Sequence, residues 1–146
     1  MMLLSRQALL AIAAVVDVAM HARPHPVPAK ALAARHDLPP RRLETMLQAL
    51  VRAQILKSVR GPRGGYELAR ERRRISAADI VRAALEVADA ETEGPPLIVS
   101  VIGPVVQQAG DAMLKALEEI SVEALSQEAA RQSRTDSSQP AMDFTI

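Results

Sequence analysis

The sequence predicts a mainly α-helical protein with one small β-hairpin and a long helix beyond its compact part. Apolar residues make up 49% of the 146 residues and are almost all aliphatic, with one Phe, one Tyr and no Trp. They recur at spacings of three and four over several stretches, which is the pattern of amphipathic helices. Only residues 55–69 combine short runs of β-forming residues with a glycine-rich turn. The length suits one domain with an added helix.

Prolines divide the first part of the chain into three predicted helices. The apolar pattern over residues 4–21 predicts a largely buried first helix, and "ARPHPVP" ends it because its prolines cannot continue a helix. Pro28 is well placed to open a short second helix, and Pro40 to open a third over residues 40–53. The third helix is expected to turn its apolar side chains inward and to expose Arg41, Arg42, Glu44, Thr45, Gln48 and Arg52.

A fourth helix is predicted directly after the hairpin. Ser76 is a suitable N-cap and Asp79 follows three residues later, as in a capping box. The inward side chains of this helix are expected to be Ile80, Val81, Ala84 and Leu85.

The second part of the chain is predicted to hold a loop, two helices and a tail. Residues 89–103 are first acidic and then apolar, and are expected to form a loop that holds a short element of undefined type. A long helix is expected from Pro104 to about Glu119, and a further helix with Ser121 as its cap. The polar composition of residues 134–146 predicts a disordered tail.

Charge is distributed unevenly along the chain. Residues 1–88 hold 15 basic and 7 acidic residues, whereas residues 89–146 hold 3 and 10. Between Arg41 and Arg74 there are 10 basic and 3 acidic residues. A solvated helix face is one explanation, and a basic surface for a negatively charged partner is the other.

Several classes of protein are excluded or disfavoured. The sequence has no cysteine, so disulfides, thiolate nucleophiles and cysteine-held zinc or iron–sulfur sites are excluded. No apolar run is long enough for a membrane span, and the N-terminal stretch lacks the basic start of a signal peptide, so we expect a cytoplasmic protein. His21, His25 and His36 lack metal-site spacing, and we expect neither a metal nor another cofactor. An enzyme is not expected, since no nucleophile–base pair or phosphate cradle is present.

The order of the predicted elements is that of a winged helix-turn-helix protein. Such proteins insert the third helix into the major groove of double-stranded DNA, and the hairpin reaches the adjacent backbone or minor groove. The turn within "VRGPRGGYELAR" suits that place, because Arg60 and Arg63 supply cations and the glycines allow a close approach of the backbone. An ordinary structural hairpin remains the alternative.

The stretch "LETMLQALVRAQILKSVRGPRGGYELAR", followed by "ISAADIVRAALE", resembles the Rrf2 family of bacterial winged-helix transcription regulators. The resemblance covers about residues 1–132. It implies a winged helix-turn-helix DNA-binding domain over 1–88, a linker or effector region over 89–103 and dimerisation helices over 104–133. It further implies a homodimer that binds a palindromic operator through the helix 40–53 and the wing 55–69, most simply as a repressor.

The resemblance also implies roles for individual residues. Glu44 matches the recognition-helix Glu, which can accept a hydrogen bond from a cytosine amino group. Arg60 matches the wing arginine expected in the minor groove. The full set of expected DNA contacts is Ser5, Arg6, Arg41, Arg42, Glu44, Thr45, Gln48, Arg60, Arg63 and Gly64.

The chain departs from the family between the fourth helix and the dimerisation helix. Many members hold an iron–sulfur cluster there through three cysteines, whereas residues 89–103 contain neither Cys nor His. A member without a cluster is therefore expected. Two alternatives stay open: a regulator gated by an unknown small molecule or partner protein, and a winged-helix protein-interaction module that has lost DNA binding.

Overall fold

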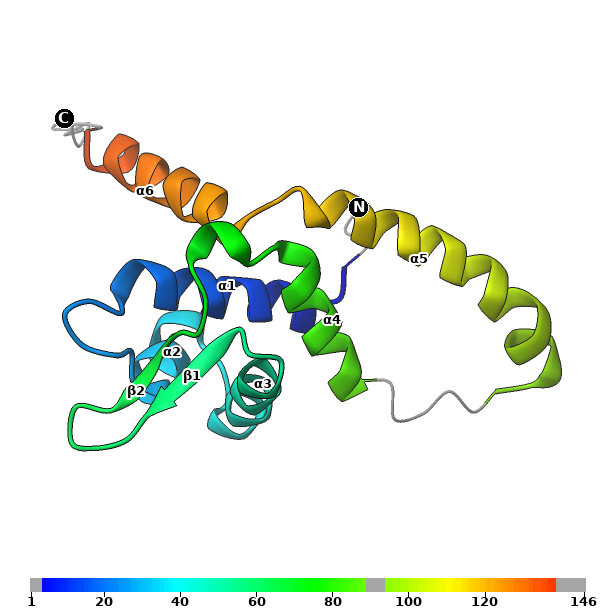
Figure 1. The fold of residues 1–146 in the computed structure, drawn as a ribbon, viewed down its shortest axis with the longest axis horizontal. Coiled ribbons are helices and arrows are strands. Elements are labelled where there is room, and N and C mark those ends of the chain that lie inside the picture. Colours follow the sequence, from blue (N-terminus) through cyan, green and yellow to red (C-terminus); the bar gives the residue numbers. More distant parts are fainter. Residues whose placement is uncertain (1–3, 89–93, 139–146) are drawn as a thin grey trace, which may run out of the picture.

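The computed structural model describes residues 4–88 and 94–138, and Figure 1 shows their arrangement. The elements are α1 (Arg6–His21), α2 (Ala29–His36), α3 (Pro40–Arg52), β1 (Leu56–Val59), β2 (Gly65–Leu68), the 3-10 turn η1 (Arg72–Arg74), α4 (Ala77–Ala88), the π-helical turn η2 (Ile98–Ile102), α5 (Gly103–Glu118) and α6 (Val122–Ser138). A mainly helical protein with one two-stranded hairpin is confirmed.

Helix α1 is the centre of the compact part. It contacts α2, β2, α4 and α6, and one of its faces is fully buried. The small residues Ala8, Ala11 and Ala14 on this face let neighbouring elements approach closely. Around it lie the buried aliphatic side chains of the core, chiefly Val15, Val18, Leu32, Leu43, Leu47, Leu50, Ile55, Leu56, Ile75, Ile80 and Val81.

The hairpin is antiparallel, with Leu56 opposite Leu68 and Val59 opposite Gly65. It is extended by a short bridge to the segment before α2. Tyr66 and Val27 exchange two backbone hydrogen bonds, of 2.8 and 2.9 Å. The hairpin is therefore fastened at its base to the end of α3 and, nearer its turn, to the segment just before α2.

Helix α4 begins with the predicted capping box. The Asp79 amide donates to Ser76 Oγ over 3.1 Å, and the Ser76 amide donates to Asp79 Oδ2 over 3.0 Å. Ile80, Val81 and Ala84 are buried as expected, but Leu85 is exposed. Leu85 lies on the rim of the helix face that packs against α1 and α3.

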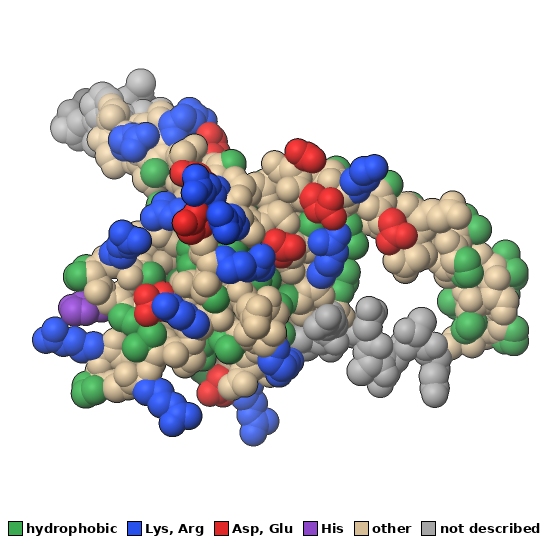
Figure 2. Space-filling view, viewed as in Figure 1, with side chains coloured by type: hydrophobic (Ala, Val, Ile, Leu, Met, Phe, Trp, Pro, Cys, Tyr) green, Lys and Arg blue, Asp and Glu red, His purple; other side chains and the backbone are tan. Residues whose placement is uncertain are grey.

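Helices α5 and α6 follow different courses. α5 forms an arm whose exposed apolar start is the tip on the right of Figures 1 and 2 and whose other end packs against α4. α6 begins at the compact part, where Val122 is fully buried and its amide donates to the Ile75 carbonyl. Residues 98–102, expected to hold a short element of undefined type within the loop, are helical and continue directly into α5. None of the described helices is both long and apolar enough to cross a membrane.

The predicted disordered tail begins too early, because α6 extends through residues 134–138. Side-chain pairs three and four residues apart support its polar surface, with Arg131 and Gln132 both donating to Glu128. The hydroxyl groups of Ser133, Thr135, Ser137 and Ser138 bond to the carbonyls four residues earlier instead of breaking the helix. Residues 139–146 lie outside the described part of the chain.

Candidate nucleic-acid interface

Helix α3 presents a continuous polar face to the solvent. Pro39 and Pro40 fix the start of the helix, and its apolar side chains Leu43, Met46, Leu47 and Leu50 are buried against the core. The opposite face exposes the predicted contact residues Arg41, Arg42, Glu44, Thr45 and Gln48. Figure 2 shows basic side chains projecting along the edge formed by α3 and the hairpin, with few acidic side chains among them.

Most of the exposed polar side chains of α3 are available to bind another molecule. Within residues 4–88 and 94–138, we find no hydrogen bond or ion pair for the side chains of Arg41, Arg42, Glu44 or Gln48. The Thr45 hydroxyl donates to the Arg41 carbonyl over 3.1 Å, so only its acceptor capacity remains. Fixed helix geometry with unsatisfied side-chain donors and acceptors is what base recognition in a groove requires.

The tip of the hairpin carries two exposed arginines, Arg60 and Arg63. Neither guanidinium has an acidic partner within the described part of the chain. The hairpin follows directly on α3 through residues 53–55, where the Ile55 amide donates to the Leu50 carbonyl over 3.0 Å. The cationic tip and the polar face of α3 are thus held in a fixed relation.

The glycines of the turn serve the hairpin itself. A Cβ on Gly64 would lie 2.4 Å from the Val59 carbonyl oxygen, and one on Gly65 would lie 2.4 Å from the Val27 carbonyl oxygen. At these two positions a side chain would collide with the protein's own backbone, which explains the glycines without a DNA phosphate. A role for them in the approach to DNA stays a prediction. Gly61 differs, since nothing lies within 4 Å of its Cβ position and its φ is +121°.

Ser5 and Arg6 lie at the start of α1, away from the hairpin tip in Figure 1. Ser5 is the N-cap of α1, and its Oγ accepts a hydrogen bond of 3.2 Å from the Ala8 amide. Its role as a DNA contact stays a prediction. The structure adds Lys30 and Lys57, both exposed, beside the predicted set. Their only sequence signal was the excess of basic residues in this half of the chain.

Comparison with known proteins shows the family. The Rrf2 family, described as "Iron-dependent Transcriptional regulator", matches residues 4–128. The chain belongs to the Rrf2 family. It is 38% identical over 80 residues to the HTH-type transcriptional regulator IscR of Xenorhabdus nematophila, a match that covers 55% of this chain and 49% of the relative. The match thus spans about half the length of the curated relative.

Solved structures of Rrf2-like regulators have the same fold. IscR of T. potens superimposes with a TM-score of 0.70 and 28% identity, covering 98% of this chain and 97% of the other. CymR of B. subtilis, titled the global cysteine regulator, gives a TM-score of 0.66 and 25% identity, covering 88% and 98%. These relatives are transcriptional regulators and not enzymes, in agreement with the expectation from sequence.

The residues of this Rrf2 protein do not fit the iron centre that the family description suggests. Iron–sulfur clusters are held mainly by cysteine thiolates, and the sequence contains no cysteine. In the described ranges, no three His, Asp or Glu residues come together in a way that could hold a metal ion. Residues 98–102, part of the segment in which the resemblance implies a cluster, instead carry exposed aliphatic side chains.

Proposed function

We propose that this Rrf2 protein is a sequence-specific DNA-binding transcriptional regulator that acts as a two-fold dimer on a palindromic operator, most simply as a repressor that occupies a promoter. The observation that carries the proposal is the alignment of the polar face of α3 with the cationic hairpin tip on one edge of the molecule. Under this proposal residues 1–88 form the DNA-binding domain, and the protein works in the cytoplasm, where bacterial DNA lies.

The chemistry of α3 suits the reading of base edges. Glu44 can accept from the amino group of cytosine, and Gln48 can make two hydrogen bonds to adenine. Arg41 and Arg42, at the start of the helix, can bind either phosphate oxygens or the acceptor edge of guanine. We therefore assign base specificity mainly to Glu44 and Gln48. Arg41 and Arg42 are assigned a larger part of the binding affinity than these two residues.

The hairpin tip suits the DNA backbone and the minor groove. Arg60 and Arg63 place two mobile cations at the end of a fastened hairpin, and a narrow minor groove attracts such groups. Lys57 on β1 lies only 4.0 Å from Glu67, so its charge is partly compensated. We therefore assign the phosphate or minor-groove contact to Arg60 first.

The arm supports dimer formation. In η2 and the first turn of α5, Ile98, Val101, Ile102, Val105 and Val106 are 44–66% exposed. A contiguous apolar surface of this kind is unusual on a monomer and is covered in oligomers. A second copy related by a two-fold axis would also place the two α3 helices about one DNA turn (~34 Å) apart, or a multiple of it.

The decisive experiment is selection of genomic DNA fragments by the purified protein at several salt concentrations. We expect a recovered palindrome and an affinity that falls steeply with salt, by about 10³–10⁵-fold between 50 and 200 mM if six to ten phosphates are contacted. Sequence-blind or absent binding would contradict the proposal and favour a protein-interaction module.

Two substitutions assign the elements on the recovered site. Arg60→Ala should weaken binding and lower the salt slope by about 1 per protomer, because one phosphate contact is lost. Glu44→Ala should relax base preference more than it lowers affinity, since a carboxylate reads a base and is repelled by phosphates. The matched control is Arg134→Ala, which removes the same charge from the exposed surface of α6. If Arg60→Ala binds like Arg134→Ala, the assignment of the wing is wrong.

A further inference from the structure

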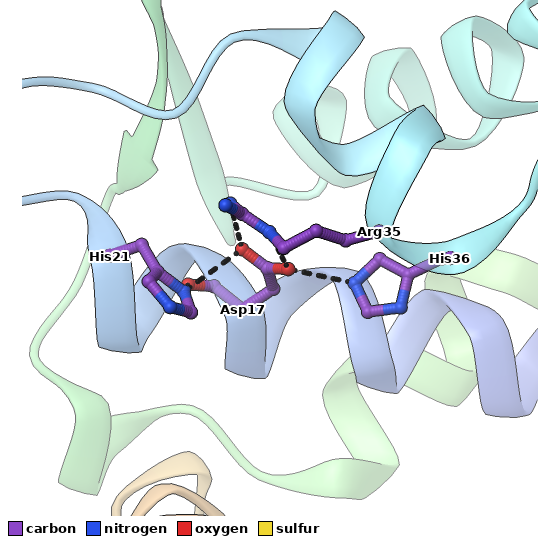
Figure 3. A network of polar contacts seen from close by, with 4 residues as sticks. All are labelled: Asp17, His21, Arg35 and His36. Carbon is purple, nitrogen blue, oxygen red and sulfur yellow. Dashed lines mark hydrogen bonds and ion pairs between the residues drawn. The ribbon is translucent and has the colours of Figure 1, made fainter.

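A charged residue is buried on the otherwise apolar inner face of α1. The Asp17 side chain is 6% exposed, and its carboxylate receives hydrogen bonds from two residues at the end of α2 (Figure 3). Arg35 donates to both carboxylate oxygens, from Nε over 2.8 Å and from Nη2 over 2.7 Å. His36 contacts the same carboxylate through Nε2, which lies 2.8 Å from Oδ2.

A third group approaches from α1 itself. His21 Nδ1 lies 2.9 Å from the Asp17 carbonyl oxygen and 3.2 Å from Oδ1. Neither acceptor can donate, so the ring nitrogens of His21 and His36 that face Asp17 carry the hydrogen. Burial alone would raise the pKa of Asp17, but the hydrogen bonds from Arg35 and His36 and the charge of Arg35 outweigh it and hold the pKa below the usual range of an aspartate. The carboxylate is therefore ionised and fully engaged.

Helix α2 is short, and the Val27–Tyr66 bridge holds the chain just before its first turn. It has eight residues, of which only Leu32 is fully buried, and its Pro28 cap makes no side-chain hydrogen bond. The cluster formed by Asp17, Arg35 and His36 holds the last turn of α2. Directly after this turn, Asp37 adopts φ +50° and the chain turns toward α3. A bidentate arginine–carboxylate pair fixes orientation as well as distance. The contacts of Asp17 with Arg35 and His36 therefore tie the last turn of α2 to α1.

We infer that Asp17 is a positioning residue for DNA binding: through Arg35 and His36 it holds α2 where Lys30, exposed on the first turn of that helix, meets a phosphate. In a helix-turn-helix the helix before the recognition helix crosses the DNA backbone. Helix α3 packs against α2 and is anchored in addition by its own buried side chains. The inference rests on the proposed function. It states that Asp17 contributes to the affinity of the protein for DNA and does not contribute to its preference for particular bases.

The test needs no knowledge of the operator, because backbone contacts act on any sequence. Wild type, Lys30→Ala, Asp17→Asn and the double variant would be titrated with a fluorescent 26-bp duplex of mixed sequence between 50 and 200 mM salt. Lys30→Ala should lower affinity about three- to tenfold and the salt slope by about 1 per protomer. Asp17→Asn should do the same, and the double variant should bind no more weakly than either single variant.

Stability is controlled separately. Far-UV circular dichroism at the assay temperature shows that each variant is folded, and Ile80→Val, in the core of α4, destabilises the protein without touching α2. Ile80→Val should keep wild-type affinity and salt slope. Arg35→Gln supplies a second route, since Arg35 is 41% exposed and its replacement removes no buried apolar side chain. It should reproduce the effect of Asp17→Asn on the salt slope.

The outcomes separate the inference from the proposed function. A folded Asp17→Asn or Arg35→Gln with wild-type affinity and slope would overturn the inference. Losses from Asp17→Asn and Lys30→Ala that multiply in the double variant would also overturn it, because a purely structural Asp17 acts independently of Lys30. Wild-type protein that fails to bind the duplex would overturn the proposed function, and the inference with it.

Discussion

Replacement of Gly65 by alanine tests how the hairpin is fastened to the body of the protein. The new Cβ would lie 2.4 Å from the carbonyl oxygen of Val27, 2.5 Å from its carbonyl carbon and 2.7 Å from the nitrogen of Pro28. All three are backbone atoms, so no side chain can rotate away. Relief requires β2 to move away from residues 27–28.

The expected cost follows from what that movement breaks. The Tyr66 amide to Val27 carbonyl bond of 2.8 Å and the reciprocal bond of 2.9 Å would both be lost. At about 1 kcal/mol net for each bond, and with residual strain, the free energy of unfolding should fall by about 2–3 kcal/mol. In a chain of this length that corresponds to a fall in Tm of about 6–10 °C.

Thermal and urea unfolding followed by circular dichroism would measure the loss. The matched control is Gly110→Ala in α5, where nothing lies within 4 Å of the new Cβ and alanine favours a helix by about 0.5–1 kcal/mol. If Gly65→Ala unfolds at the same temperature as Gly110→Ala, the bridge between residue 27 and the hairpin does not contribute as described.

Two further predictions concern Asp17 and the arm. Because the pKa of Asp17 is lower in the folded protein than in the unfolded chain, its stabilisation is present above about pH 4 and is lost as the pH falls through the folded value. The difference in free energy of unfolding between wild type and Asp17→Asn should therefore shrink between pH 5 and pH 3 in urea titrations, and a constant difference would contradict the ion-pair account. Val105→Asp places a charge on a side chain that is 66% exposed in the monomer. It should leave the Tm at low protein concentration nearly unchanged but shift sedimentation toward the monomer, whereas Gln127→Asp, on exposed α6 surface, should do neither.

The local rules of sequence predicted most elements correctly. For α3, the apolar spacing and the proline at its start correctly predicted the helix, its buried side and its exposed polar face. The capping box of Ser76 and Asp79 appears with both of its reciprocal bonds. These features depend on residues within four positions of one another, which a linear pattern contains.

Features that depend on distant partners were not predicted. The role of Asp17 could not be predicted from the sequence, because its partners Arg35 and His36 are 18 and 19 residues away. The docking of α6 through Val122 was likewise hidden, since an amphipathic helix does not reveal which surface it will cover. At Gly64 and Gly65 the sequence indicated that a side chain could not be accommodated. It did not show that the obstacle is the backbone of Val59 and Val27.

The arm is tied to the compact part where α5 ends. There the 2.6 Å ion pair of Arg82 with Glu118 joins α4 to the last residue of α5, and the Ser76–Ser121 bridge and buried Val122 follow within four residues. The exposed apolar tip, Ile98–Ile102, lies at the opposite end of α5. The composition of the tip can therefore change without altering the contacts that hold the base of the arm on the compact part.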